Sequence, residues 1–204
     1  MREALSFRYA HTDAEVIDAA AEVIDEVMDG EDGSVALMLE NLWYPGLNLL
    51  DPEMTRRLLE RISYPNKGIM LDTGHLMHTD FSLASQAEAL EYLGRVLDAH
   101  ERAGVLPYFR GMHLQQSLTG EFCRRLQAHP PELSGSWTER CGVLFENIFK
   151  IDRHLPFTAP GVRALVDRLP LEYLTFEFIT ESREQLGEFH SLQWDALGRD
   201  LMCA

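Results

Sequence analysis

Short apolar runs alternate with longer amphipathic segments along most of this chain, and this alternation constrains the fold more than any other feature. It is typical of strand–helix units that build a parallel sheet. We predict helices over residues 12–28, 52–62, 85–103, 161–169 and 182–201. The apolar runs between them predict six strands, at residues 5–10, 35–39, 68–71, 108–112, 148–151 and 173–176.

The number of strands decides the kind of sheet. A closed eight-stranded barrel uses about 250 residues and rarely fewer than about 200, and this chain has 204. We predict an α/β fold of the (β/α) TIM-barrel type that lacks the first two units, so that about six of eight strands are present. An open sheet is the alternative. Residues 1–204 are expected to form a single domain, and an insertion at residues 130–137 is expected to form a lid or a contact with another subunit of a homo-oligomer.

The composition narrows the class of ligand. The formal net charge is −15, with 33 acidic and 18 basic residues, which disfavours nucleic acid because phosphate binding relies on basic side chains. No apolar run reaches the roughly 18 residues of a membrane span, and no secretion signal is visible. Three cysteines without a CxxC pair argue against a disulfide framework. We therefore predict a cytoplasmic protein that acts on a small molecule.

Polar side chains of metal-ligand type follow every predicted strand. In a parallel barrel the carboxyl ends of the strands converge at one face, and carboxylates with imidazoles bind zinc or manganese. One such residue alone is more often a helix cap or a solvated charge, but six strand ends together predict a divalent-metal site. The candidate ligands are His11, Glu40, Asp72, His75, His113, Asp152, His154 and Glu177.

Six further residues fall outside this pattern. The other histidines are expected at the surface, and two aromatic residues after strand ends are expected either to wall a substrate pocket or to pack within loops. The histidines are His78, His100, His129 and His190, and the aromatic residues are Trp43 and Phe157.

Five segments carry a resemblance to a known family. They are Leu37-Met-Leu-Glu-Asn41, Gly68-Ile-Met-Leu-Asp-Thr-Gly-His75, Gly111-Met-His-Leu114, Asp152-Arg-His154 and Phe176-Glu-Phe178. Together they resemble the xylose-isomerase-like TIM-barrel superfamily, which includes sugar-phosphate isomerases and epimerases and the apurinic endonuclease IV group. The resemblance extends from about residue 5 to about residue 180.

The epimerase members imply a site with one metal ion. The resemblance gives its ligands as Glu40, Asp72, His113 and Glu177, with Glu40 and Glu177 also exchanging protons with substrate carbon and His75 contacting the sugar. A metal-stabilised enediolate suits that proton transfer. The first functional hypothesis is therefore a divalent-metal-dependent isomerase or epimerase of a sugar or sugar phosphate.

The endonuclease IV group implies a different site, in which three zinc ions serve phosphoester hydrolysis. Its additional ligands correspond to His11, His75, Asp152 and His154. One to three ions are thus compatible with the sequence, and a multinuclear-zinc phosphoester hydrolase is the second hypothesis. The third is an inactive truncated barrel that keeps its ligands without a closed pocket.

Overall fold

The structure is a computed structural model, and it describes residues 2–198. Its parallel sheet has strands β1 (Leu37–Glu40), β2 (Lys67–Asp72), β3 (Phe109–His113) and β4 (Tyr173–Thr175). The helices are α1 (Arg2–Ser6), α2 (Asp13–Val27), α3 (Pro52–Arg61), α4 (Thr73–Met77), α5 (Gln86–Arg102), α6 (Gly120–Ala128), α7 (Trp137–Ile151), α8 (Val162–Val166) and α9 (Arg183–Leu197), with a 3-10 turn η1 (Leu106–Tyr108).

The strands lie in chain order, β1-β2-β3-β4, and every neighbouring pair is parallel. This confirms the α/β fold and four of the six predicted strands. Each connection crosses back along helices, as parallel strands require. Within residues 2–198, β1 and β4 pair on one side each, so that this part of the chain forms an open arc of sheet and not a closed barrel.

Two predicted strands are wrong. Residues 5–10 begin inside α1, where Leu5 buries its side chain against α6 and α7. Residues 148–151 form the last turn of α7, whose start is fixed by a capping box between Ser136 and Glu139. A short apolar run does not distinguish a strand from a buried helix segment. Residues 5–6 and 148–151 are helical, and residues 7–10 belong to the connection from α1 to α2.

The two faces of the sheet differ in chemistry because side chains alternate along a strand. Leu39, Ile69, Leu71 and Met112 point into the main apolar core, which they share with α3, α5 and α8. The intervening positions hold Met38 and Glu40 on β1, Met70 and Asp72 on β2, and Gly111 and His113 on β3. The ligand-type residues therefore stand at the carboxyl ends of the strands, on the face opposite the main core.

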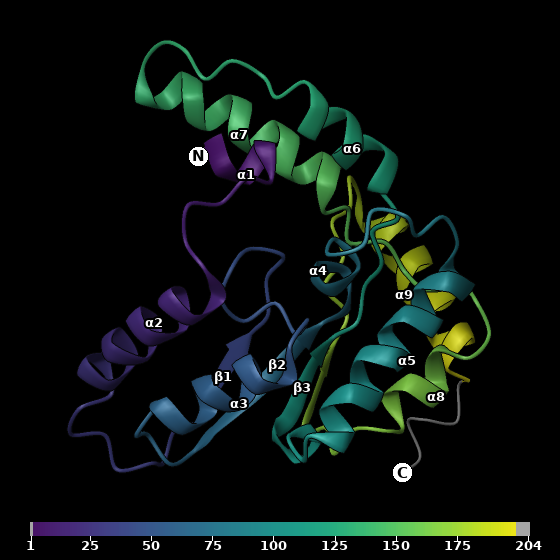
Figure 1. Cartoon of the computed structure of the whole chain (residues 1–204). Helices are drawn as coiled ribbons and strands as arrows, with labels where there is room; N and C mark the ends of the chain where they lie inside the picture. The colour runs from purple at the N-terminus through teal and green to yellow at the C-terminus, as the bar shows by residue number, and fades with distance from the viewer. Residues whose placement is uncertain (1, 199–204) are drawn as a thin grey trace.

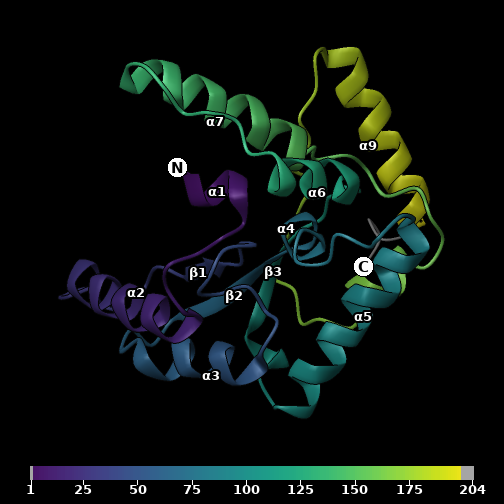
Figure 2. The ribbon, with the colours of Figure 1, turned by 45° about the horizontal axis from the view of Figure 1, so that its top comes forward.

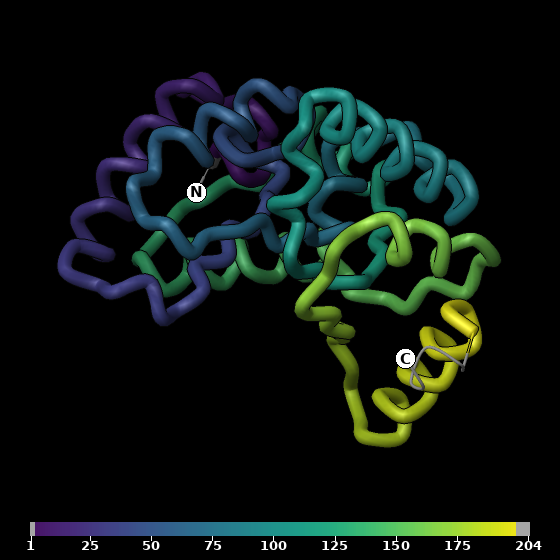
Figure 3. The backbone as a smooth tube through the Cα atoms, turned by 90° about the horizontal axis from the view of Figure 1, so that it is seen from below, coloured from purple at the N-terminus to yellow at the C-terminus, as the bar shows by residue number. Residues whose placement is uncertain are grey.

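The helices form two groups around the sheet. α2, α3 and α5 lie beside the strands, whereas α1, α6 and α7 gather beyond α4, at the carboxyl ends of the strands (Figures 1 and 2). α9 lies at the periphery (Figure 3) and is anchored by Gln193 and Leu197, both buried. The predicted helix over 182–201 is confirmed up to Leu197, and its last residues lie outside the described range. No helix among residues 2–198 is long and apolar enough to span a membrane.

Candidate metal centre

Four ligand-type side chains meet at the ends of the four strands. Glu40, Asp72 and His113 are the last residues of β1, β2 and β3, and Glu177 follows β4 by two residues. One ligand atom from each lies within 4.8 Å of all the others. The Nδ1 atom of His113 is central, at 3.4 Å from Glu40 Oε1, 3.8 Å from Asp72 Oδ2 and 3.2 Å from Glu177 Oε2. We call these four residues the first group.

Two atoms of the first group indicate that it suits a cation. Asp72 Oδ2 and His113 Nδ1 are buried and have no hydrogen-bond partner among residues 2–198. A buried acceptor without a partner costs free energy, and three carboxylates beside a neutral imidazole would bring three negative charges together. A divalent ion offsets both effects, and this mixture of oxygen and nitrogen ligands is typical of zinc and manganese sites.

A second group consists of His75, Asp152 and His154, whose ligand atoms also lie within 4.8 Å of one another. The Nδ1 atoms of both histidines face backbone carbonyl oxygens, of Asn41 at 2.9 Å and of Glu177 at 2.8 Å. Because a carbonyl only accepts, each Nδ1 carries the hydrogen. The two Nε2 atoms then point at Asp152 Oδ2, at 3.1 and 2.7 Å. Three acceptors that face one another require protons or a metal ion between them.

The electrostatics of both groups follow from these contacts. Burial opposes ionisation of Asp152, but hydrogen bonds from His154, His75 and His78 hold the pKa of its carboxyl far below the usual value. Burial likewise disfavours a charged His75, yet the Asp152 carboxylate raises the pKa of His75 to about 9. The neighbouring Glu40 carboxylate raises the pKa of His113, whereas burial raises that of Asp72.

Hydrogen bonds between side chains and the backbone hold the strand ends in place. The Asn41 side chain donates to the Asp72 carbonyl at 3.1 Å and accepts from the Asp72 N–H at 2.8 Å, so that it joins the ends of β1 and β2. The Oγ atom of Ser117 accepts from the backbone N–H groups of Arg153 and His154, at 2.7 and 3.2 Å. His154 itself has a positive φ of 49°, a conformation that costs roughly 1 kcal/mol or more and persists where surrounding contacts enforce it.

Comparison with known proteins agrees with this architecture. A family model described as "xylose isomerase-like TIM barrel" matches residues 5–169, most of the chain. The chain belongs to the xylose isomerase-like TIM barrel family. That family is largely made up of enzymes, among them isomerases, epimerases and endonucleases of the endonuclease IV type. No curated protein matches the chain well enough to serve as a relative.

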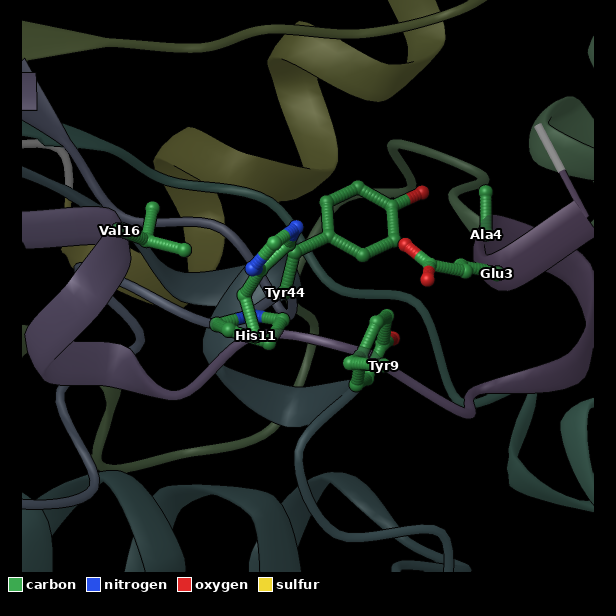
Figure 4. Close-up of a pocket in the computed structure, with 7 residues that line it drawn as sticks. Glu3, Ala4, Tyr9, His11, Val16 and Tyr44 are labelled. Carbon is green, nitrogen blue, oxygen red and sulfur yellow. The ribbon is translucent and has the colours of Figure 1, made fainter. Parts of the chain in front are cut away.

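His11 does not join the other candidate ligands of this xylose isomerase-like barrel. It is exposed and belongs to neither group. It lines a separate cavity of about 270 Å³, beside Glu3, Tyr9 and Tyr44 (Figure 4). The prediction of a strand at residues 5–10 had placed it at a strand end, and the connection from α1 to α2 carries it elsewhere.

Two histidines that the sequence analysis placed at the surface are buried, one of them beside the second group. His78 is 3% exposed, with Nε2 at 3.4 Å from Asp152 Oδ1, and His100 on α5 is fully buried, with Nε2 facing Thr55 of α3. The prediction that both lie at the surface is wrong, whereas His129 and His190 are exposed as predicted. His78 follows His75 by three residues, a spacing that places both on one face of a helix. That spacing was a signal for a shared role.

The two aromatic candidates, Trp43 and Phe157, lie in different surroundings. Trp43 makes edge contacts with His75 on α4 and with His78 at its C-cap, with ring centroids 5.0 and 4.9 Å away. It also lines a cavity of about 280 Å³ together with Tyr44 and Phe81. Phe157 is fully buried in the main core, so that its role is packing.

Proposed function

We propose that this protein is a divalent-metal-dependent isomerase or epimerase of a sugar or sugar phosphate. The observation that carries the proposal is the first group itself. Four ligands from four adjacent strand ends converge within 4.8 Å, and two buried ligand atoms have no hydrogen-bond partner in the described part of the chain. Family membership supports an enzyme, and the net charge of −15 favours a small-molecule substrate over nucleic acid.

The exposure of the four side chains supports different roles for them in metal binding and in proton transfer. The Asp72 side chain is fully buried and can serve only as a ligand, whereas the side chains of Glu40 and Glu177 are 37% and 45% exposed. Those two carboxylates can therefore reach a substrate. One Oε atom of each lies close to His113 Nδ1, at 3.4 and 3.2 Å, so that one carboxylate can remove a proton from substrate carbon and the other can return one.

His75 is proposed to orient the substrate. Its ring is fixed by the Asn41 carbonyl and by Trp43, and its Nδ1 atom lies 3.3 Å from Glu40 Oε1. A divalent ion held by the first group would stabilise the negative charge that develops on the substrate oxygens during proton removal. Zinc and manganese both suit the ligand set.

Proton exchange at substrate carbon tests the proposal. A panel of ketoses and ketose phosphates would be incubated with the metal-loaded protein in deuterium oxide, and deuterium incorporation followed by NMR. We expect exchange with the native protein and its loss in Glu177→Gln. The matched control is Glu181→Gln, at an exposed glutamate in the same connection, which should exchange at the native rate. Retained exchange in Glu177→Gln would contradict the proposed roles.

The second group favours one other function, a multinuclear-zinc phosphoester hydrolase of the endonuclease IV type. His75, Asp152 and His154 are positioned as ligands for a further ion. Against it, His11 stands outside both groups. Elemental analysis of the purified protein separates the two: about three zinc ions per chain would favour the hydrolase, and a single exchangeable ion would favour the isomerase.

A further inference from the structure

Gln115 lies between the two ligand groups, two residues after His113 and fully buried. Its amide nitrogen donates to Asp72 Oδ1 at 2.9 Å and to Asp152 Oδ1 at 3.1 Å. Its amide oxygen accepts from Ser117 Oγ at 3.1 Å. A nitrogen between two carboxylates and an oxygen facing a hydroxyl is the only orientation of this amide that satisfies all three contacts. One neutral side chain thus joins an aspartate of each group.

The contact with Gln115 gives the two carboxylate oxygens of Asp72 different surroundings. Oδ1 accepts from Gln115 Nε2 and from the His75 backbone N–H at 2.7 Å. Oδ2 has no hydrogen-bond partner among the residues that the structure describes, and it lies 3.8 Å from His113 Nδ1. The donors therefore fix the rotation of the carboxyl group and leave one oxygen for the first group.

The two oxygens of Asp152 differ in the same way. Its Oδ1 atom lies 3.1 Å from Gln115 Nε2, 3.3 Å from Ser117 Oγ and 3.4 Å from His78 Nε2. Its Oδ2 atom faces the Nε2 atoms of the two histidines of the second group. The amide of Gln115 thus contacts Oδ1 of both aspartates, the oxygen that hydrogen bonds hold in place.

Gly74 provides the space for this amide. A Cβ atom at position 74 would lie 2.0 Å from Gln115 Nε2 and 2.2 Å from both Cδ and Oε1. Any larger residue would displace the amide, although the backbone of Gly74 lies in α4 with no positive φ. The glycine of the Asp-Thr-Gly-His segment is therefore explained by Gln115, which follows a different strand, β3.

We propose that Gln115 is a positioning residue shared by the two groups. By holding Oδ1 of both aspartates it presents Oδ2 of Asp72 to the first group and Oδ2 of Asp152 to the second. The inference rests on the metal centre proposed above. Partners of this kind that orient metal ligands typically contribute about 10–100-fold to metal affinity.

Two variants test this role by different routes. Gln115→Met removes the amide at similar length, and Gly74→Ala pushes the amide aside while placing a good helix former in α4. The matched control is Gln116→Met, because Gln116 is also buried but, within the described residues, its amide hydrogen-bonds only to the Pro156 carbonyl, at 3.4 Å. Chelator-treated proteins would be titrated with Zn²⁺ by calorimetry. Ring ¹H–¹⁵N NMR spectra of His75 and His154 would report the second group in the metal-free state.

We expect Zn²⁺ affinity to fall about 10–100-fold in Gln115→Met and Gly74→Ala, and the ring signals of His75 and His154 to shift in both. Gln116→Met should match the native protein in both measurements. Native zinc affinity in the two test variants would overturn the inference and leave the metal centre standing. A change confined to one measurement would overturn the sharing between groups, and a native protein that takes up no Zn²⁺ would overturn the metal centre and the inference together.

Discussion

The pKa values of two buried histidines are shifted in opposite directions because the partners of the two rings differ. His75 lies against the Asp152 carboxylate, which favours its charged form and raises its pKa to about 9 despite burial. His100 has neutral partners: Nδ1 donates to the Val96 carbonyl at 2.9 Å, and Nε2 accepts from Thr55 Oγ1 at 3.0 Å. Burial lowers the pKa of His100 below 6.5, against the Val96 carbonyl and the more distant Asp51 carboxylate.

His100 should therefore destabilise the fold in mild acid. A histidine whose pKa is lowered by folding makes its full contribution to stability above pH 6.5. That contribution is lost as the pH falls below 6.5, because the unfolded chain then binds a proton that the folded chain does not bind. For the pH unit between 6.5 and 5.5 this loss is at most about 1.4 kcal/mol. Urea unfolding of chelator-treated protein at pH 7.5 and 5.5 measures it.

The variant His100→Gln, which cannot titrate, should lose less stability than the native protein over this interval. His190→Gln, at an exposed histidine, should keep the native pH dependence. Equal losses in the native protein and His100→Gln would contradict a neutral, buried imidazole at this position.

At the residue level much of the site was predictable from spacing. Glu40, Asp72, His113 and Glu177 could be identified because strand ends converge, and the structure brings them together. Gln115 and Ser117 follow His113 at intervals of two, the period that keeps residues on one face of an extended chain. That signal was present, but only the folded structure shows that Gln115 reaches both aspartates, since Asp152 is 37 residues away.

At the level of elements, α1 supports the site from the side. Leu5 is 1% exposed and belongs to a second apolar cluster with Trp43, Cys123, Leu126 and Ile151. Trp43 in turn contacts His75 on α4 and His78 at the end of that helix. The helix that replaces the predicted strand at residues 5–10 thus connects α6 and α7 with the wall of the metal centre.

Removing the anchor of α1 should be costly. Leu5→Ala is expected to lower the free energy of unfolding by roughly 2–4 kcal/mol, the usual cost of a Leu-to-Ala cavity in a core. Denaturant unfolding with and without Zn²⁺ measures the loss. Leu186→Ala on α9, at a leucine that is 37% exposed, should change stability by about 0.5 kcal/mol or less. A similarly small effect of Leu5→Ala would mean that α1 is not docked as described.

Some strands and helices could be predicted from the sequence more reliably than others. The strands that end in Glu40, Asp72 and His113 lie between clear helices, and their apolar runs were identified correctly. Residues 148–151 were mistaken for a strand because the run Ile-Phe-Lys-Ile fits either period. The capping box at Ser136, twelve residues earlier, was the better guide.

For the whole molecule, a metal ion bound to the folded chain but not to the unfolded chain stabilises the fold. At a free ion concentration of 100 times the dissociation constant this stabilisation is about 2.7 kcal/mol. For a chain of this size that corresponds to a shift of roughly 5–10 °C in the melting temperature. Calorimetry before and after chelator treatment measures the shift, and Asp72→Asn, which removes a buried ligand, should abolish it. An unchanged melting temperature on chelation would contradict a tightly held ion.

The alternation of the strands has a consequence for how this gene tolerates change. Ligand residues and core residues occupy opposite faces of the same short strands, so that a one-residue shift in a strand exchanges the two sets. A single-codon deletion within Leu37–Glu40, Lys67–Asp72 or Phe109–His113 would turn a carboxylate or imidazole into the apolar core. Deletion scanning should therefore find these strands intolerant of any length change, whereas the loop at residues 130–135, exposed apart from Pro131 and Leu133, should absorb insertions and deletions.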